Sequence, residues 1–390
     1  MLNCGICCII LLLQSKGLLP LIVIKAESNI KWFPILIITG GKIMKIKWGV
    51  IGCGGIADRR TLPGMMLADN VELVAVMDAN IDFALKAKEK YGAKYAFDKA
   101  EDLIALDEID AVYIASPVAF HTEQTVMAAK AKKHILLEKP MTLTSEKSKE
   151  LAEICAENGV KIGVGLMMRF HTYHQLMKEL IKDGKLGEIV SMRAQLTCWY
   201  PDMPGNWRQA KDTAGGGSLM DMGIHCVDLL QYISGLKVKE VASFSGTQIF
   251  NYEVEDGGSI IMRMENGATA YVDANFNIPD DAAVCKLEIY GTEGSIFAEG
   301  TIGQVEGGSV RVTICGDQGA YNAAQERQAT NSYIMEAELG NMYTKEVEGF
   351  SNAVINDTLP PVTALDAVNV QQIIEAAYKS NEIKAFVEIK

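Results

Sequence analysis

The chain has 390 residues, of which 49% are hydrophobic and 22% charged, with a formal net charge of −12 and a pI near 5.1. This length predicts two domains, and the acidic balance argues against a nucleic-acid or membrane partner, because both partners select for clustered lysine and arginine. An anionic ligand remains compatible with this charge where backbone N–H groups bind it. The cysteines after residue 50 show no close pairing, which indicates a reducing compartment and a cytoplasmic protein.

Residues 1–43 contain short apolar runs separated by charged and turn-forming residues. Each run is shorter than the roughly 20 residues that span a bilayer. The first cation, Lys16, follows the first apolar run, whereas a secretory signal carries its positive charge before that run. We therefore expect this segment to lie outside the fold, upstream of a true start at Met44, with a membrane tether as the alternative. Cys4, Cys7 and Cys8 lack a second ligand pair nearby, so we expect no metal site there.

The first strong pattern is the apolar run IKWGVI followed by GCGGIA, a G-x-G-x-x-A motif. It predicts a strand that turns directly into a helix. Gly52 permits the tight turn, Gly54 lets the backbone approach a pyrophosphate, and Ala57 allows close packing of helix on strand. The start of the helix, at Gly55 and Ile56, would offer free N–H groups to the phosphates.

A second apolar run, VELVAVMD, ends in Asp78. Its distance from the glycines is close to the roughly 20 residues expected of an acid that binds ribose. A carboxylate there accepts hydrogen bonds from the ribose hydroxyls and repels a 2′-phosphate, so the two motifs predict NAD, with NADP disfavoured. The alternative is that Asp78 is an ordinary turn residue at the end of a strand.

Strands and helices alternate up to about residue 165. Such alternation indicates an α/β Rossmann domain over residues 44–165, built on a doubly wound parallel sheet that binds ligands outside the carboxyl ends of its strands. Helices are expected at 81–91, 99–106, 122–132 and 145–158, and further strands at 94–97, 110–116, 134–140 and 160–165. The candidate cofactor contacts at the strand ends are Ser116, Pro117, His121, Glu138 and Lys139.

From about residue 187 the pattern changes to strands joined by short turns, such as Asn266-Gly267 and the hairpin at 286–300. We therefore expect residues 166–390 to form an α+β domain with a large, mostly antiparallel open sheet. Helices on one face would leave the other face uncovered, so a homodimer or homotetramer through that face is expected. The helices of this half are expected near 172–183, 217–234, 343–356 and 364–380.

Three glycines lead into the helix expected at 217–234. At 3.6 residues per turn, Asp221, His225 and Asp228 fall on one side of that helix. One interpretation is a surface helix that turns its polar side to water. The other is an acid/base pair brought close to a ligand by small residues.

Taken together, these motifs resemble the glucose-fructose oxidoreductase/inositol dehydrogenase (Gfo/Idh/MocA) family over about residues 44–390. The likeness rests on GCGGIA, Asp78, the tripeptide EKP, the stretch GGGSLMDMGIHCVDLL, the hairpin GTEGS and the closing stretch from EGFSNAVIN onward. It implies that Lys139 matches the family's EKP lysine and that Asp221 and His225 match its D-x-x-x-H pair. Residues 1–43 have no counterpart in the family.

The resemblance implies an NAD(P)-dependent oxidoreductase acting on a sugar, polyol or related carbonyl substrate, and no metal is needed. Neutral His225 would take the hydroxyl proton as the hydride leaves, Lys139 would stabilise the developing alkoxide, and Asp221 would orient the imidazole or bind a neighbouring hydroxyl. The helix dipole disfavours the imidazolium and Asp221 favours it, so we expect His225 to exchange protons near pH 7.

Four further side chains are candidate substrate contacts, because aromatic faces suit the C–H side of a sugar and charged groups suit its hydroxyls. Each is equally compatible with ordinary packing. They are Arg169, Tyr200, Trp207 and Arg208. Two other functions stay open: a glycosidase that retains NAD and oxidises the sugar transiently, and a cofactor-binding regulator without catalysis. Net turnover of the cofactor distinguishes the glycosidase from a dehydrogenase.

Overall fold

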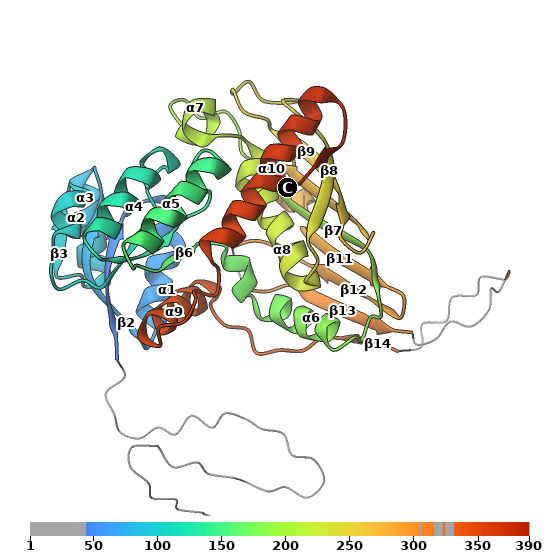
Figure 1. Cartoon of the computed structure of the whole chain (residues 1–390), viewed down its shortest axis with the longest axis horizontal. Coiled ribbons are helices and arrows are strands. Elements are labelled where there is room, and N and C mark those ends of the chain that lie inside the picture. Colours follow the sequence, from blue (N-terminus) through green and yellow to red (C-terminus); the bar gives the residue numbers. More distant parts are fainter. Residues whose placement is uncertain (1–43, 305, 316–322, 324–330, 390) are drawn as a thin grey trace, which may run out of the picture. The chain divides into compact units, whose positions relative to one another are not determined.

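The computed structural model describes residues 44–304, 306–315, 323 and 331–389 (Figure 1). The predictions for residues 1–43, including those for the three clustered cysteines, lie outside the described residues. From residue 44 onward the chain packs as one compact unit. Within the described ranges no helix has both the length and the apolar character needed to cross a membrane.

The first sheet has six parallel strands in the order β3-β2-β1-β4-β5-β6. This order confirms the predicted doubly wound Rossmann fold. All four residues of β4 are buried, as expected of a strand inside a parallel sheet. The strands are β1 (Ile46–Ile51), β2 (Val71–Met77), β3 (Tyr95–Phe97), β4 (Ala111–Ile114), β5 (His134–Leu137) and β6 (Ile162–Val164).

Capping residues set both ends of helix α2 in this half. Asn80 caps α2, its side chain accepting a hydrogen bond from the Asp82 N–H, and Gly92 ends the helix with a φ of 75°. The segment after the glycine motif begins as a π-helical turn, η1, before it becomes α1. The bounds are η1 (Ala57–Thr61), α1 (Leu62–Leu67), α2 (Ile81–Tyr91), α3 (Ala100–Ile104), η2 (Val118–Phe120), α4 (His121–Lys130) and α5 (Ser145–Glu157).

The second sheet has nine strands in the order β14-β13-β12-β11-β7-β10-β9-β8-β15. Only the pairing of β7 with β10 is parallel, so the predicted mostly antiparallel sheet is confirmed. Its strands are β7 (Ile189–Thr197), β8 (Val238–Gly246), β9 (Gly257–Met264), β10 (Thr269–Asn275), β11 (Lys286–Gly291), β12 (Gly294–Glu299), β13 (Ser309–Ile314), β14 (Ser332–Ile334) and β15 (Val387–Glu388).

Helices cover one face of this second sheet (Figure 1). Along β9 the inward residues Ile260, Met262 and Met264 are fully buried, whereas Ile261, between them, is 42% exposed on the other face. That outer face carries ion pairs such as Arg263–Glu240 and Arg193–Glu288. The helices of this half are η3 (Met167–Phe170), α6 (Thr172–Lys182), η4 (Trp207–Gln209), α7 (Lys211–Ala214), η5 (Leu219–Gly223), α8 (Ile224–Ser234), η6 (Asp280–Ala282), α9 (Met342–Ile355) and α10 (Ala364–Ile383).

Helix α9 packs against the first sheet although it lies late in the chain. Phe350 stacks near Trp48, with ring centroids 5.5 Å apart, and the Trp48 indole N–H donates a 3.3 Å hydrogen bond to Ser351 Oγ. Val347 and Phe350 belong to the same buried cluster as β1 and β2. Helix α10 in turn packs on both α5 and β8. The two closing helices therefore tie the nucleotide half to the second sheet.

Candidate active site

A cavity of about 460 Å³ is lined by residues of both halves. Lys139 and Ser116 come from the carboxyl ends of the parallel strands, while Asp221 and His225 come from the helix-covered side of the second sheet. A second cavity, of about 650 Å³, is lined by the glycine motif. Ile56, Ala115, Ser116, Trp207 and Arg208 line both cavities, so the two adjoin.

The glycine motif leaves room for a phosphate. Gly52 has a φ of +92°, and an added Cβ would lie 2.8 Å from the Ser116 nitrogen, so the backbones of β1 and β4 meet there without space for a side chain. Around Gly54 an added Cβ would find no atom within 4 Å. Ala57 is fully buried under the helix, as its predicted packing role requires. The residues present therefore fit a dinucleotide whose phosphates lie over Gly54 and Gly55.

The contacts of Asp78 agree with both interpretations, a turn residue at the end of a strand and a ligand for ribose. Its carboxylate accepts 2.9 Å hydrogen bonds from the N–H groups of Cys53 and Asn80, as a turn residue does. It also lines the second cavity, as a ribose ligand would. A carboxylate has room for about four hydrogen bonds, so the turn leaves acceptor capacity for a ligand.

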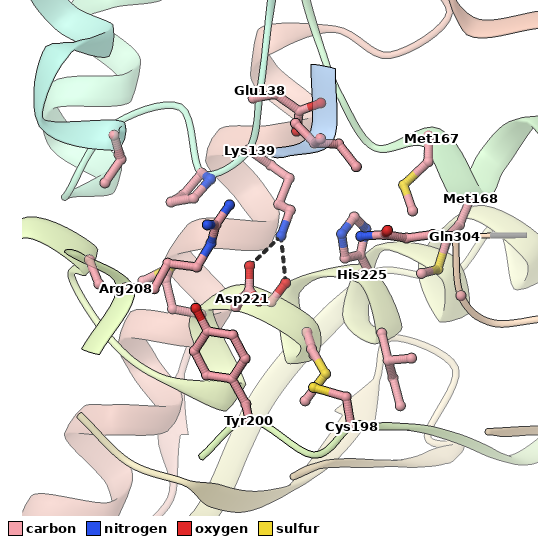
Figure 2. A pocket seen from close by; sticks show the side chains of 18 of the residues that line it. Glu138, Lys139, Met167, Met168, Cys198, Tyr200, Arg208, Asp221, His225 and Gln304 are labelled. Carbon is pink, nitrogen blue, oxygen red and sulfur yellow. Dashed lines mark hydrogen bonds and ion pairs between the residues drawn. The ribbon is translucent and has the colours of Figure 1, made fainter. Parts of the chain in front are cut away.

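Lys139 and Asp221 join the two halves inside the first cavity (Figure 2). The Lys139 ammonium donates one 2.7 Å hydrogen bond to Asp221 Oδ1 and another of 2.7 Å to the Asp221 carbonyl oxygen. The Lys139 side chain is 14% exposed and that of Asp221 is 36% exposed, so the carboxylate keeps an open side. His225, one helical turn after Asp221, lines the same cavity and is 5% exposed. The structure thus brings the three predicted catalytic side chains together.

The protonation states of this group follow from burial and from the neighbouring cations. Burial acts to raise the pKa of Asp221, but Lys139 and Arg208 oppose it and hold this pKa at about 2. For His225, burial and the Lys139 charge lower the pKa to about 3. In the folded chain this pKa therefore lies below the near-neutral value expected from the sequence, because desolvation and the Lys139 charge act in the same direction as the helix dipole and together outweigh Asp221. The imidazole is neutral, and its Nδ1 is enclosed with no hydrogen-bond partner among the described residues.

Two of the three glycines before the helix are needed for close packing. A Cβ on Gly216 would overlap the Tyr378 hydroxyl, and one on Gly217 would overlap the Glu255 carbonyl oxygen. The Glu255 carboxylate accepts hydrogen bonds from the N–H groups of Gly217 (2.8 Å) and Leu219 (2.9 Å). Glu255 therefore caps the π-helical turn η5, which carries Asp221, and fixes its start against the neighbouring loop.

The helix that carries His225 is not a surface helix. Asp228, on the same side of α8, is 1% exposed and accepts hydrogen bonds of 2.9 and 3.0 Å from Arg169 Nε. Arg169 also lies 3.4 Å from Asp366 of α10. Arg169 does not line either cavity, so its prediction as a substrate contact is corrected: its guanidinium ties η3 to α8 and α10.

Of the other predicted cofactor contacts, some line a cavity and one mainly holds neighbouring loops together. Ser116 and Pro117 line the second cavity. His121 reaches the first cavity but is 1% exposed, with both ring nitrogens within 3.2 Å of the carbonyl oxygens of Ser116, Pro140 and Met141. It therefore holds the β4 and β5 loops together and offers little surface to a ligand.

Tyr200, Trp207 and Arg208 line the first cavity, so they remain candidate substrate contacts. Tyr200 accepts a 2.8 Å hydrogen bond from Asn206, which fixes its hydroxyl. Several lining residues were not predicted, because no sequence motif marks them. They include Arg59, Met167, Met168, Gln304 and Tyr343.

Comparison with known proteins identifies the family. Residues 46–166 match an oxidoreductase family with an NAD-binding Rossmann fold, and residues 174–297 match the GFO/IDH/MocA C-terminal domain. Over 258 residues the chain is 30% identical to Oxidoreductase P35 of Formosa agariphila, which covers 65% of this chain and 78% of that protein. The chain belongs to the Gfo/Idh/MocA family. It is therefore an NAD(P)-dependent oxidoreductase.

Two further similarities bear on this Gfo/Idh/MocA oxidoreductase. It is 28% identical over 323 residues to the 1,5-anhydro-D-fructose reductase of Ensifer adhaerens, covering 83% of this chain and 92% of the reductase. Its fold is similar to that of the aldose-aldose oxidoreductase of Caulobacter crescentus solved with glycerol, with a TM-score of 0.79 and 23% identity, covering 88% of this chain and all of the other.

Burial of neutral His225 predicts a specific pH dependence of stability. The pKa of His225 is about 3 in the folded chain, against an ordinary value of 6.5. The free energy of unfolding therefore falls as pH falls through 6.5 towards 3, by about 2 kcal/mol between pH 7 and pH 5. The variant His225→Asn should lack this pH-dependent part of the free energy of unfolding, which is measured by urea unfolding at pH 7 and pH 5. In the control His134→Asn, at a half-buried histidine, the change should be smaller. Equal pH dependence in wild type and His225→Asn would contradict the assignment.

Proposed function

We propose that this protein transfers a hydride between a nicotinamide dinucleotide and a CH–OH carbon of a sugar, polyol or related carbonyl compound. The observation that carries the proposal is the common cavity of Lys139, Asp221 and His225, beside the glycine motif. In this proposal residues 44–165 hold the nucleotide and residues 166–390 supply the other wall. The names of the reductase and the aldose oxidoreductase among the relatives support a sugar-like substrate.

When bound, the nicotinamide supplies or accepts the hydride. The Lys139 ammonium has three N–H donors, and the two oxygens of Asp221 take two of them. The third stays available for the substrate oxygen, where it stabilises the negative charge that develops as the hydroxyl proton leaves. Asp221, with its pKa near 2, remains ionised and keeps the ammonium in place.

His225 is the proposed proton acceptor in the direction of alcohol oxidation. Its Nδ1 is enclosed, so Nε2 is the ring nitrogen left for the substrate hydroxyl. The imidazole is neutral and therefore has a free lone pair to receive the proton. In the opposite direction the same nitrogen returns the proton to the carbonyl oxygen.

Removing the lysine or the histidine should lower turnover far more than it lowers cofactor affinity. In Lys139→Met and His225→Asn we expect kcat/KM on the best member of a sugar and polyol panel to fall by about 100-fold or more, which is the range of lost acid/base catalysis. NADH affinity, measured by fluorescence, should change little. Lys130→Met, on the exposed side of α4, is the control. Collapse of NADH binding with turnover retained would overturn the assignment, and cleavage of aryl glycosides without net NADH formation would favour the NAD-retaining glycosidase.

We propose NAD as the preferred dinucleotide, because the Asp78 carboxylate at the wall of the second cavity would repel a 2′-phosphate. Asp78→Asn keeps one acceptor oxygen and removes the charge, so the ratio of NADPH to NADH affinity should rise by about tenfold or more. Asp82→Asn, an exposed position in the next helix, makes the same charge change as a control. Calorimetric titration with both reduced cofactors measures the ratio, and an unchanged ratio would contradict the preference.

We also propose that a second copy of the chain covers the outer face of the nine-stranded sheet. Ile261 and Phe244 expose 42% and 82% of their surface there, on neighbouring strands. A charge in the middle of that face should prevent association, so Ile261→Glu should sediment as a monomer while wild type sediments as a dimer or tetramer. Leu85→Glu, on the exposed surface of α2, is the matched control. A monomeric wild type in sedimentation velocity would rule out the assembly.

A further inference from the structure

A buried acidic cluster lies behind the catalytic lysine. Glu346, on α9, is 2% exposed, and neither of its carboxyl oxygens has a hydrogen-bond partner among the described residues. Buried polar groups are almost always paired, so an unpaired carboxyl in a protein core calls for an explanation. The proposed roles of Lys139, Asp221 and His225 make no use of it.

The acid whose charge acts on Glu346 is Glu138, the residue before Lys139. The Glu138 carboxyl accepts a 2.5 Å hydrogen bond from the Tyr113 hydroxyl, which lies 2.9 Å from Thr61 Oγ1. Glu138 also lines the first cavity, so it connects the buried cluster to the substrate site. Burial raises the pKa of Glu138, and burial together with the Glu138 charge raises that of Glu346 well above its usual range. Because the charge of one acts on the other, ionisation of Glu138 disfavours ionisation of Glu346, and the two carboxyl groups titrate as a coupled pair.

The other titratable and charged groups around this cluster come from α9 itself, from η1 and from β4. Tyr343 precedes Glu346 by three residues on α9, is 1% exposed, lines the first cavity and has a hydroxyl without a partner among the described residues. Arg60 of η1 has a buried Nε that is likewise unpartnered. Tyr113 faces Glu138 from β4. The charges of Lys139 and Arg208 lower the pKa of Glu138 against the effect of burial. The Lys139 ammonium is nevertheless paired with Asp221, and neither carboxyl of the pair forms an ion pair within the described ranges. Without a paired cation, the raised pKa of Glu346 favours the protonated form of its carboxyl group.

We propose that Glu138 and Glu346 form a proton store whose occupancy follows the charge of the nicotinamide. The inference rests on the proposed function only in requiring that both redox forms of the dinucleotide bind. The oxidised ring is positive and the reduced ring is neutral, and both would lie against the cavity wall that Glu138 and Tyr343 help to form. The pair accordingly loses a proton when the oxidised form binds and keeps it when the reduced form binds.

The charge balance of the reaction agrees with such a store. Oxidation of the alcohol breaks a C–H bond, whose electron pair leaves as hydride, and an O–H bond, whose proton is released. Reduction removes the positive charge from the ring at the same time. The carboxylate pair then regains one proton, so the net charge enclosed in the site stays constant through the turnover. A constant enclosed charge matters in a low-dielectric cavity, where an uncompensated charge is costly.

Calorimetry with NAD⁺ and NADH tests this without any substrate. Titrations of the whole protein in phosphate and in Tris, whose ionisation enthalpies differ, yield the number of protons released on binding. We expect NAD⁺ to release up to about one proton per chain and NADH to release fewer. The dissociation constant for NAD⁺ should accordingly fall by as much as about tenfold for each pH unit between 7 and 8, and that for NADH should change less.

Glu346→Gln supplies the decisive variant, because glutamine copies the shape of the protonated acid and cannot ionise. It should abolish the difference in proton release between NAD⁺ and NADH. Glu348→Gln, two residues further on α9 where the carboxylate accepts from the Asp69 N–H, makes the same change outside the cluster and should preserve the difference. Folding is checked independently. A carboxyl with a raised pKa loses stability as pH rises, so at pH 8 Glu346→Gln should melt at or above the wild-type temperature.

Each outcome decides the matter. Equal proton release for the two cofactors in wild type, or a difference that persists in Glu346→Gln, would overturn the proton store and leave the dehydrogenase proposal intact. Failure of both cofactors to bind would overturn the proposed function together with the store. Loss of the difference in Glu346→Gln alone supports the inference.

Discussion

The ion pair between Lys139 and Asp221 is the interaction on which the site depends. It joins the end of a parallel strand to the first turn of a helix from the other half of the chain, with two 2.7 Å hydrogen bonds to one residue. The pair keeps Asp221 ionised and directs the ammonium into the cavity that His225 also lines. Charged groups this close in a partly dehydrated space interact strongly, so each fixes the state of the other. This contact brings side chains from the two halves of the chain together in one cavity.

Several buried polar side chains hold the helices and loops of the site in position. Glu255 caps the turn that carries Asp221, Arg169 ties that helix to its neighbours through Asp228, and His121 bridges the two loops that form the cofactor wall. Such groups are expensive to bury and are stable only when their partners are in place. Rigid support of this kind lets a few side chains hold their geometry before a ligand arrives. Glu346 differs from these supports, since it has no protein partner among the described residues.

Local sequence patterns predicted the helices and strands well, but they predicted the surroundings of individual side chains less well. The helix at 81–91 occurs at the predicted residues because Asn80 and Gly92 set its ends through short-range contacts. His225 was placed correctly on its helix, but its acidity was not, because desolvation depends on β7, on the loop after β12 and on Lys139, all distant in sequence. Arg169 looked like a ligand for sugars since its partners, Asp228 and Asp366, lie 59 and nearly 200 positions away.

The sequence by itself determined what depends on neighbours along the chain: the glycine turn at Gly52, the strand–helix alternation, the hairpin at Gly267 and the shared side of Asp221, His225 and Asp228. Tertiary structure alone decided that Asp221 and His225 face the cavity and that Asp228 forms an ion pair with Arg169. It also placed α9, and with it Glu346 and Tyr343, against the nucleotide half. Helical periodicity selects a direction for a side chain, but the partner found in that direction is chosen by long-range packing.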